Sequence, residues 1–254
     1  MKGLKKYAHA DRAEVVAEIV PLVRRKFGGN LIALAAQGSF ARGDDAAYSD
    51  LELIAFVREM PGENKDWEGI GKIRDGLLVE LIWTTREAYL RQTREVTKDW
   101  FLAGSDRLLP IINEEFIREL SDYRVENLDE KCLVQAKLHW HEVQEATSKT
   151  LNAAAARDRE AVPLLFSDML IHMLILLSFL NRKPFTTFAR FIAEARHFET
   201  KPPEFEKLLD IMTAGDFVNF PHLEQTIERV FTQFEAIFES LGVELYDADI
   251  DPDN

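Results

Sequence analysis

The first half of the chain alternates between helical and strand-like hydrophobic patterns. Apolar residues spaced three and four apart predict an amphipathic helix, and short apolar runs predict strands. The polar, glycine-containing segment Pro61–Gly76 predicts a loop or a wide hairpin. The other elements expected before residue 125 are helices at about Asp11–Lys26 and Arg86–Lys98, and strands at Leu31–Gln37, Leu51–Val57, Gly76–Thr84 and Arg107–Ile112.

After about residue 125 the strand patterns vanish and only helical periodicity remains. Prolines fall at or near the breaks between the helical segments, as expected at helix ends. The longest apolar run, Met169–Leu180, is too short to span a bilayer and predicts a buried helix. We therefore expect an α+β fold, with an α/β domain at 1–125 and a helical bundle at 126–254. The expected helices are Leu128–Ala155, Val162–Leu180, Thr187–His197, Pro203–Met212 and His222–Leu241.

Two carboxylates stand at the start of the second predicted strand. Asp50 and Glu52 alternate with Leu51 and Leu53, so the two acids share one face of the strand and the leucines the other. Two neighbouring acids repel each other, and oxygen ligands of this kind suit Mg²⁺, which usually also holds substrate phosphates. Such alternation by itself is more often the solvated face of an edge strand.

The third predicted strand favours the metal interpretation. Its run from Gly76 to Trp83 is apolar except for Glu80. An isolated buried carboxylate is costly unless it is paired or bound to a metal. If this strand neighbours the second one, Glu80 completes a cluster with Asp50 and Glu52, which favours metal-assisted phosphoryl or nucleotidyl transfer.

A Gly-Ser pair follows the first predicted strand. Gly38 lets the backbone approach a ligand closely, and Ser39 adds a hydroxyl and an N–H. A helix N-terminus or nest at this point would hold a triphosphate, and Arg42 is near enough in sequence to reach a phosphate oxygen. Taken singly, these residues are an ordinary turn and a surface arginine. Their position ahead of Asp50 and Glu52 gives them weight.

Gly38-Ser39, a ten-residue spacer and Asp50-Leu51-Glu52-Leu53 together resemble the signature of the DNA polymerase β-like nucleotidyltransferases. The amino-acid sequence of this segment is Gly-Ser-Phe-Ala-Arg-Gly and then Tyr-Ser-Asp-Leu-Glu. It is similar to that of the aminoglycoside 4′-O-nucleotidyltransferases, the kanamycin nucleotidyltransferase group. The resemblance implies a nucleotidyltransferase domain with a mixed sheet flanked by helices. The implied Mg²⁺ ligands are Asp50, Glu52 and Glu80, and the implied nucleotide contacts are Gly38, Ser39 and Arg42.

The resemblance extends into the second half of the chain. That group has a glutamate followed four residues later by a lysine on a long helix, and Glu145 and Lys149 match this pair. Their spacing places both on one helix face, where an exposed ion pair is the simpler interpretation from the residues alone. The resemblance implies that Glu145 is the general base and that Lys149 contacts the nucleotide phosphates. Thr186-Thr187 matches a Thr-Thr pair of the family, and the resemblance implies that Thr187 contacts the nucleotide. Either threonine could cap the following helix, whose N-terminus would favour phosphate.

The segment Pro61–Gly76 departs from the family pattern. The group uses this region to hold the amines of the acceptor, and Glu63, Asp66 and Glu68 are the candidates here. The divergence favours the second class of the group, which is restricted to the 4′ position.

Composition limits the remaining choices. The net charge of −13 counts against a nucleic-acid partner and is compatible with a cationic substrate, although many soluble proteins are acidic. With Cys132 as the single cysteine and no signal peptide, a cytoplasmic protein is expected. His139 and His141 are two residues apart on a helix and do not face each other, so zinc is not expected.

The sequence thus resembles a magnesium-dependent adenylyltransferase that moves AMP from ATP to the 4′-hydroxyl of aminoglycosides such as kanamycin, tobramycin or amikacin and releases pyrophosphate. The resemblance implies a homodimer with sites near the subunit interface, and no nucleic acid or membrane partner is expected. Two alternatives stay open. One is an enzyme of the same fold acting on a protein or RNA, and the other is a degenerate binding module, which would normally lack one of the three carboxylates.

Overall fold

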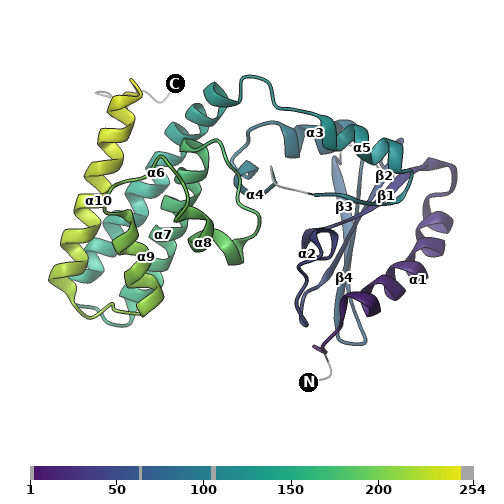
Figure 1. The fold of residues 1–254 in the computed structure, drawn as a ribbon, viewed down its shortest axis with the longest axis horizontal. Coiled ribbons are helices and arrows are strands. Elements are labelled where there is room, and N and C mark those ends of the chain that lie inside the picture. The colour runs from purple at the N-terminus through teal and green to yellow at the C-terminus, as the bar shows by residue number, and fades with distance from the viewer. Residues whose placement is uncertain (1–2, 63–64, 104–106, 247–254) are drawn as a thin grey trace. The chain divides into compact units, whose positions relative to one another are not determined.

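A computed structural model of the chain describes residues 3–62, 65–103 and 107–246, and Figure 1 labels its helices and strands. The chain divides into two compact units. The first runs to Glu95 and includes Ser105–Glu126, and the second takes Val96–Gly104 together with the chain from Asn127 onward.

The first unit is built on a five-stranded mixed sheet in the order β3-β4-β2-β1-β5. β2 pairs with β4 in parallel, and the remaining neighbours pair antiparallel. With the helices that flank the sheet and the helical second unit, this gives the α+β fold and the mixed sheet that the sequence predicts. The strands are β1 (Leu31–Gln37), β2 (Leu51–Val57), β3 (Trp67–Arg74), β4 (Leu77–Thr84) and β5 (Leu109–Ile112).

Helices cover both faces of this sheet because the central strands are apolar on both sides. α1 (His9–Phe27) packs its buried residues, such as Val23, against one face. α3 (Arg86–Arg94) and α5 (Glu114–Asp122) pack on the opposite face through residues such as Tyr89 and Ile117. Two short helical turns, η1 (Gly28–Asn30) and α2 (Gly38–Arg42), flank β1.

Most of these elements agree with the sequence prediction, but β3 was not expected as a separate strand and α5 was not predicted. β1 and β2 have the predicted bounds, and the strand expected at Gly76–Thr84 is β4. The segment Pro61–Gly76, expected to be a loop or a wide hairpin, contains β3, the edge strand that pairs antiparallel with β4, so only the loop interpretation is wrong. Residues 69–74 of β3 are exposed, so this strand carries no alternation of buried and polar positions.

The second unit is helical, and α6 (Leu128–Ala155) and α7 (Ala161–Leu180) form its centre. By length and composition α7 could cross a membrane, but 61% of its most apolar window is buried inside the unit, as in a core helix. α10 (Phe220–Ser240) covers α6, where Trp140 contacts Phe231, Phe234 and Phe238. The other elements of this unit are α4 (Trp100–Ala103), η2 (Phe188–Arg190), α8 (Phe191–Ala195) and α9 (Phe205–Ala214).

Candidate active site

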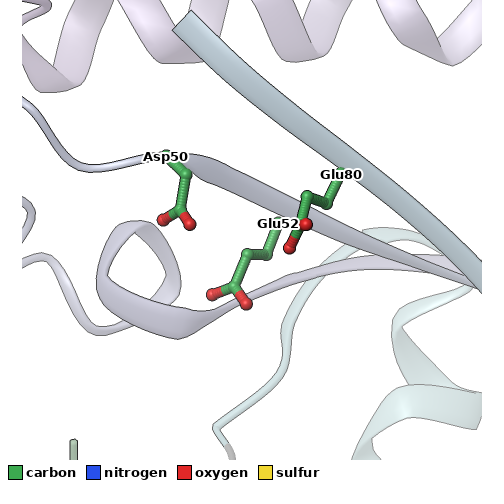
Figure 2. Close-up of side chains that lie close together, drawn as sticks. All are labelled: Asp50, Glu52 and Glu80. Atoms are coloured by element: carbon green, nitrogen blue, oxygen red, sulfur yellow. The ribbon is translucent and has the colours of Figure 1, made fainter. Parts of the chain in front are cut away.

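Three carboxylates meet at one end of the central strands, and we call Asp50, Glu52 and Glu80 the carboxylate cluster. In the parallel register of β2 and β4, Glu52 lies directly opposite Glu80, so both side chains project from the same face. Asp50 precedes β2 by one residue and lies two positions before Glu52. One oxygen of each residue lies within 4.8 Å of those of the others, and all three residues are half-buried (Figure 2).

Strand alternation explains why these acids are accessible. In β2 the odd-numbered residues, such as Leu51 and Leu53, belong to the core under α1. The even-numbered Ile54 and Phe56 pack under α3 and α5. Glu52 shares their face at the other end of the strand, so a single alternating pattern yields a core on one part of this face and the acids on the other.

The donor set fits a hard divalent cation. It includes no cysteine or histidine and consists of carboxylate oxygens, which are the ligands that Mg²⁺, Ca²⁺ and Mn²⁺ prefer. Like charges held this close repel one another, and a bound cation would offset that repulsion. Across the described part of the chain, no other group of three or more His, Cys, Asp or Glu side chains converges in this way.

Gly38 lies against the cluster because β1 ends beside β2. Gln37, the last residue of β1, pairs with Glu52, and the chain turns into α2 at the next residue. Gly38 has φ +67°, and a Cβ at this position would lie 1.8 Å from Oε2 of Glu52. Only glycine fits both the backbone conformation and this approach of the carboxylate. Ser39 follows in the first turn of α2.

Arg42 ends α2 and is engaged within its own loop. Its Nε donates to Oδ1 of Asp44 over 3.2 Å, and the arginine side chain is largely buried. Gly43 follows in the left-handed conformation, with φ +75°.

Glu145 and Lys149 lie one turn apart on α6, in the helical unit. Their carboxylate and ammonium groups form an ion pair of 2.7 Å, and the side chains are 59% and 55% exposed. The hydrogen bond and charge of Lys149 lower the pKa of the Glu145 carboxyl, and Glu145 raises the pKa of Lys149 in return. The structure therefore brings Glu145 and Lys149 together, as their spacing of four residues on a helix predicts.

Thr187 does not cap a helix as predicted. It precedes the three-residue η2, and its side chain makes no capping hydrogen bond. The helix expected over Thr187–His197 is divided into η2 and the five-residue α8. The segment is held by the carboxylate of Glu194, which accepts from the backbone N–H of Thr186 over 2.9 Å. Thr187 therefore does not bring a capped helix N-terminus to a phosphate.

Comparison with known proteins identifies the family. Residues 118–244, half of the chain, match the family described as the KNTase C-terminal domain. The chain belongs to the KNTase family. It is 22% identical over 237 residues to the aminoglycoside nucleotidyltransferase (4′) of Staphylococcus aureus, and equally to that of a Bacillus species. Each alignment covers 91% of this chain and 92% of the relative. A crystal structure of a nucleotidyltransferase-like protein from Exiguobacterium sibiricum 255-15 is similar with a TM-score of 0.48 and 14% identity, covering 89% of this chain and 75% of that one.

The candidate acceptor carboxylates of this KNTase chain are already paired with cations. Asp66 forms an ion pair of 2.9 Å with Arg91, and Glu68, in β3, lies 3.7 Å from Lys65. Glu63 lies outside the described residues. An acceptor amine that binds Asp66 or Glu68 therefore has to displace Arg91 or Lys65 from the carboxylate, or share the carboxylate with it.

Gln37 stands beside the carboxylate cluster, a neighbour that the sequence did not predict. Its register with Glu52, and that of Glu52 with Glu80, sets the three residues in a row across three neighbouring strands. The signal was present in β1, where Ala33 and Ala35 share the face of Gln37.

Proposed function

We propose that this KNTase chain is a magnesium-dependent aminoglycoside O-nucleotidyltransferase. It transfers AMP from ATP to the 4′-hydroxyl of drugs such as kanamycin, tobramycin or amikacin and releases pyrophosphate. The observation that carries the proposal is the carboxylate cluster beside Gly38, because its donor set suits Mg²⁺ with bound nucleotide phosphates. The names of the two curated relatives support the acceptor class and the 4′ position.

The first unit holds the nucleotide in this proposal. Asp50, Glu52 and Glu80 bind the metal, which supplies positive charge against the phosphate oxygens when bound. Gly38 and Ser39 accept a phosphate group against their backbone, because the first N–H groups of α2 have no partner within the helix. Arg42 exchanges its contact with Asp44 for a phosphate oxygen.

Glu145 removes the proton from the acceptor hydroxyl in the same step. The hydroxyl oxygen forms a bond to the α-phosphorus, and the bond from this phosphorus to the bridging oxygen of pyrophosphate breaks. In the free chain Lys149 holds the pKa of Glu145 low, which disfavours proton uptake. When Lys149 moves to the nucleotide phosphates, Glu145 loses this partner and becomes the stronger base.

Two properties of the whole chain enter the proposal. The net charge of −13 attracts a polycationic drug and speeds its encounter with the protein. We also propose a homodimer in which Glu145 of one copy serves the carboxylate cluster of the other, with Thr187 contacting the nucleotide. The activity belongs in the cytoplasm, where ATP is available.

Pyrophosphate release tests the proposal. The purified chain is assayed with ATP, Mg²⁺ and a panel of aminoglycosides, with drugs that lack a 4′-hydroxyl as controls. Release is expected only with drugs that carry this hydroxyl, and Asp50→Asn and Glu145→Gln are expected to abolish most of it. Glu114→Gln removes the same charge from an exposed position on α5 and keeps full activity. No release with any drug would contradict the proposed substrate class.

A further inference from the structure

Arg12, in the first turns of α1, is fully buried and uses every one of its N–H donors. Nε donates to the carbonyl oxygen of Ser49 over 3.2 Å. Nη1 donates to the carbonyl oxygen of Tyr7 over 3.0 Å and to Oδ2 of Asp45 over 2.9 Å. Nη2 donates to the carbonyl oxygens of Ala46 over 2.8 Å and Ser49 over 2.7 Å. A guanidinium has five such donors, and all five are used here.

A buried ion pair of this kind is an expensive way to stabilise a fold. The Asp45 side chain is only 2% exposed, so both charges have left water. The desolvation of two charges often exceeds what their attraction returns, and apolar residues of similar size would serve stability as well. The pair therefore points to a role in fixing a particular conformation, and its contacts show which one.

Arg12 fixes the segment that leads directly to Asp50. Three of its five hydrogen bonds go to carbonyl groups at positions 46 and 49, and a fourth goes to Asp45. The same segment is closed by a bond of 2.9 Å from the N–H of Ala46 to Oγ of Ser49. The backbone is thus held up to the residue before Asp50.

Asp50 depends on this segment more than the other two acids of the cluster do. Glu52 and Glu80 lie within paired strands, and the β2–β4 ladder sets their positions. Asp50 precedes β2 (Leu51–Val57), so no ladder of that strand includes it. A loop residue without such pairing is placed by whatever holds its loop.

His9 extends the same network to the other loop of the site. Its Nδ1 lies 2.7 Å from Oδ1 of Asp45. Its ring stacks on Phe40 with 4.5 Å between ring centroids. Phe40 belongs to α2, the turn that contains Gly38 and Ser39. The start of α1 therefore touches both segments that flank the carboxylate cluster.

We propose that His9, Arg12 and Asp45, here called the α1 clamp, position the Asp50 carboxylate for metal binding. Arg12 is a positioning residue that acts through the 45–49 backbone and does not itself touch the metal or the nucleotide. The inference rests on the metal site in the proposed function, and it adds the part of the chain that holds one ligand of that site in place.

Mn²⁺ binding to the full chain tests the clamp without any drug. The dissociation constant is measured from the electron paramagnetic resonance signal of free Mn²⁺, with and without α,β-methylene-ATP. Arg12→Lys keeps the charge but supplies fewer donors without the planar fork. It is expected to weaken Mn²⁺ binding about 10-fold or more, the usual effect of removing support from a metal ligand. The Mg²⁺ concentration for half-maximal pyrophosphate release rises in parallel, and saturating Mg²⁺ restores most of kcat.

Val23→Ala is the matched control. Val23 lies on the same helix, is buried in the core of the first unit and makes no contact with the 45–49 segment among those described. This variant lowers the melting temperature and leaves the Mn²⁺ dissociation constant unchanged. If Arg12 serves stability alone, Arg12→Lys also lowers the melting temperature and leaves the Mn²⁺ dissociation constant unchanged. That result would overturn the proposed role of the α1 clamp.

Ser49→Ala keeps the test open if Arg12→Lys does not fold. It removes only the acceptor of the Ala46 N–H, and it is expected to weaken Mn²⁺ binding at least about 3-fold with little change in melting temperature. Mn²⁺ affinity within twofold of wild type in every folded variant contradicts the inference, as does a wild-type chain without a Mn²⁺ site. A third outcome is that the wild-type chain binds Mn²⁺, that Asp50→Asn abolishes this binding, and that the wild-type chain releases no pyrophosphate with aminoglycosides. This outcome contradicts only the proposed function.

Discussion

At Gly38 the backbone lies against the Glu52 carboxylate of the carboxylate cluster. We expect Gly38→Ala to displace the Glu52 carboxylate, because the added methyl would lie 1.8 Å from Oε2 on a backbone with φ +67°. Metal affinity should fall about 10- to 100-fold. The folded state should lose roughly 1–3 kcal/mol from backbone strain. Mn²⁺ titration and thermal unfolding measure the two effects separately.

Gly43→Ala provides the control for this substitution. Gly43 has φ +75°, and an added Cβ would meet nothing within 4 Å. The variant therefore carries the strain without the collision, and it should lose stability but keep its metal affinity. Equal losses of metal affinity in the two variants would show that strain alone disturbs the cluster.

The ion pair of Glu145 and Lys149 sets the sign of a pH effect. Lys149 lowers the pKa of the Glu145 carboxyl, so Lys149→Gln should raise it toward the ordinary value. A base with a higher pKa is protonated at a higher pH. The acidic limb of the kcat/KM profile, which reports the free enzyme, is therefore expected to move to higher pH. At the optimum, kcat/KM should fall roughly 100-fold because a phosphate contact is lost.

Lys137→Gln is the matched control, because Lys137 is an exposed lysine on the same helix. Its pH profile should coincide with that of the wild type. An acidic limb that stays in place in Lys149→Gln would mean that a group other than Glu145 accepts the proton.

At the scale of elements, the hydrophobic patterns predicted the features that depend on neighbouring residues alone, such as the bounds of a strand or the face on which a side chain lies. β1, β2 and α6 have the predicted bounds because each has a strong apolar period. The alternation of acids and leucines also placed Asp50 and Glu52 on one face. The position of Glu80 depended on which strands are neighbours, and the β2–β4 pairing confirms that condition.

The elements and contacts that the sequence did not predict depend on tertiary context. β3 is an edge strand without a buried face, so its residues read as a loop. Nothing in the sequence indicates that Arg12 is buried, because most of its acceptors lie more than thirty residues away, at Asp45, Ala46 and Ser49. The hydrophobic periodicity of a sequence reports only local structure, so it cannot indicate a hydrogen bond between residues this far apart in the chain.

The packing of α6 on α7 predicts an effect of pH on stability. Burial, and after it the charge of the His172 side chain, lower the pKa of His139 to about 4. Nε2 of His139 lies 3.2 Å from the carbonyl oxygen of His172, and this hydrogen bond raises the pKa by less. Glu142 raises this pKa and His141 lowers it, but both effects are smaller. In the unfolded chain a histidine titrates near its ordinary value of about 6.5. Between these two values the unfolded state binds more protons, so the folded state loses stability as the pH falls from about 6.5 to 4.

His139→Gln should remove this loss, on the order of 2 kcal/mol, when urea unfolding at pH 7.5 is compared with unfolding at pH 5. His141→Gln is the control, because that side chain is 72% exposed on the same helix. If both variants kept the pH dependence of the wild type, the destabilisation would arise from another group.

At the scale of the whole molecule, the chain passes between its two units more than once. Val96–Gly104 groups with the helical unit, and the chain then returns to the first unit up to Glu126. Trp100 in α4 is buried and stacks on Phe179 of α7, with 6.3 Å between ring centroids. The carbonyl oxygen of Phe101 accepts from the N–H of Phe185 over 2.7 Å. Position in the sequence therefore does not decide which unit a residue stabilises.

Trp100→Ala is expected to destabilise the helical unit by about 3–5 kcal/mol, the usual cost of truncating a buried tryptophan. Hydrogen exchange followed by mass spectrometry should show reduced protection in α7 and unchanged protection in β2. Leu120→Ala is the reciprocal control, because Leu120 of α5 is fully buried in the core of the first unit. It should lower protection in β2 and leave α7 unchanged, at a cost of about 2–5 kcal/mol. If each substitution lowered protection in both units equally, the two units would unfold as one, and α4 would not belong to either alone.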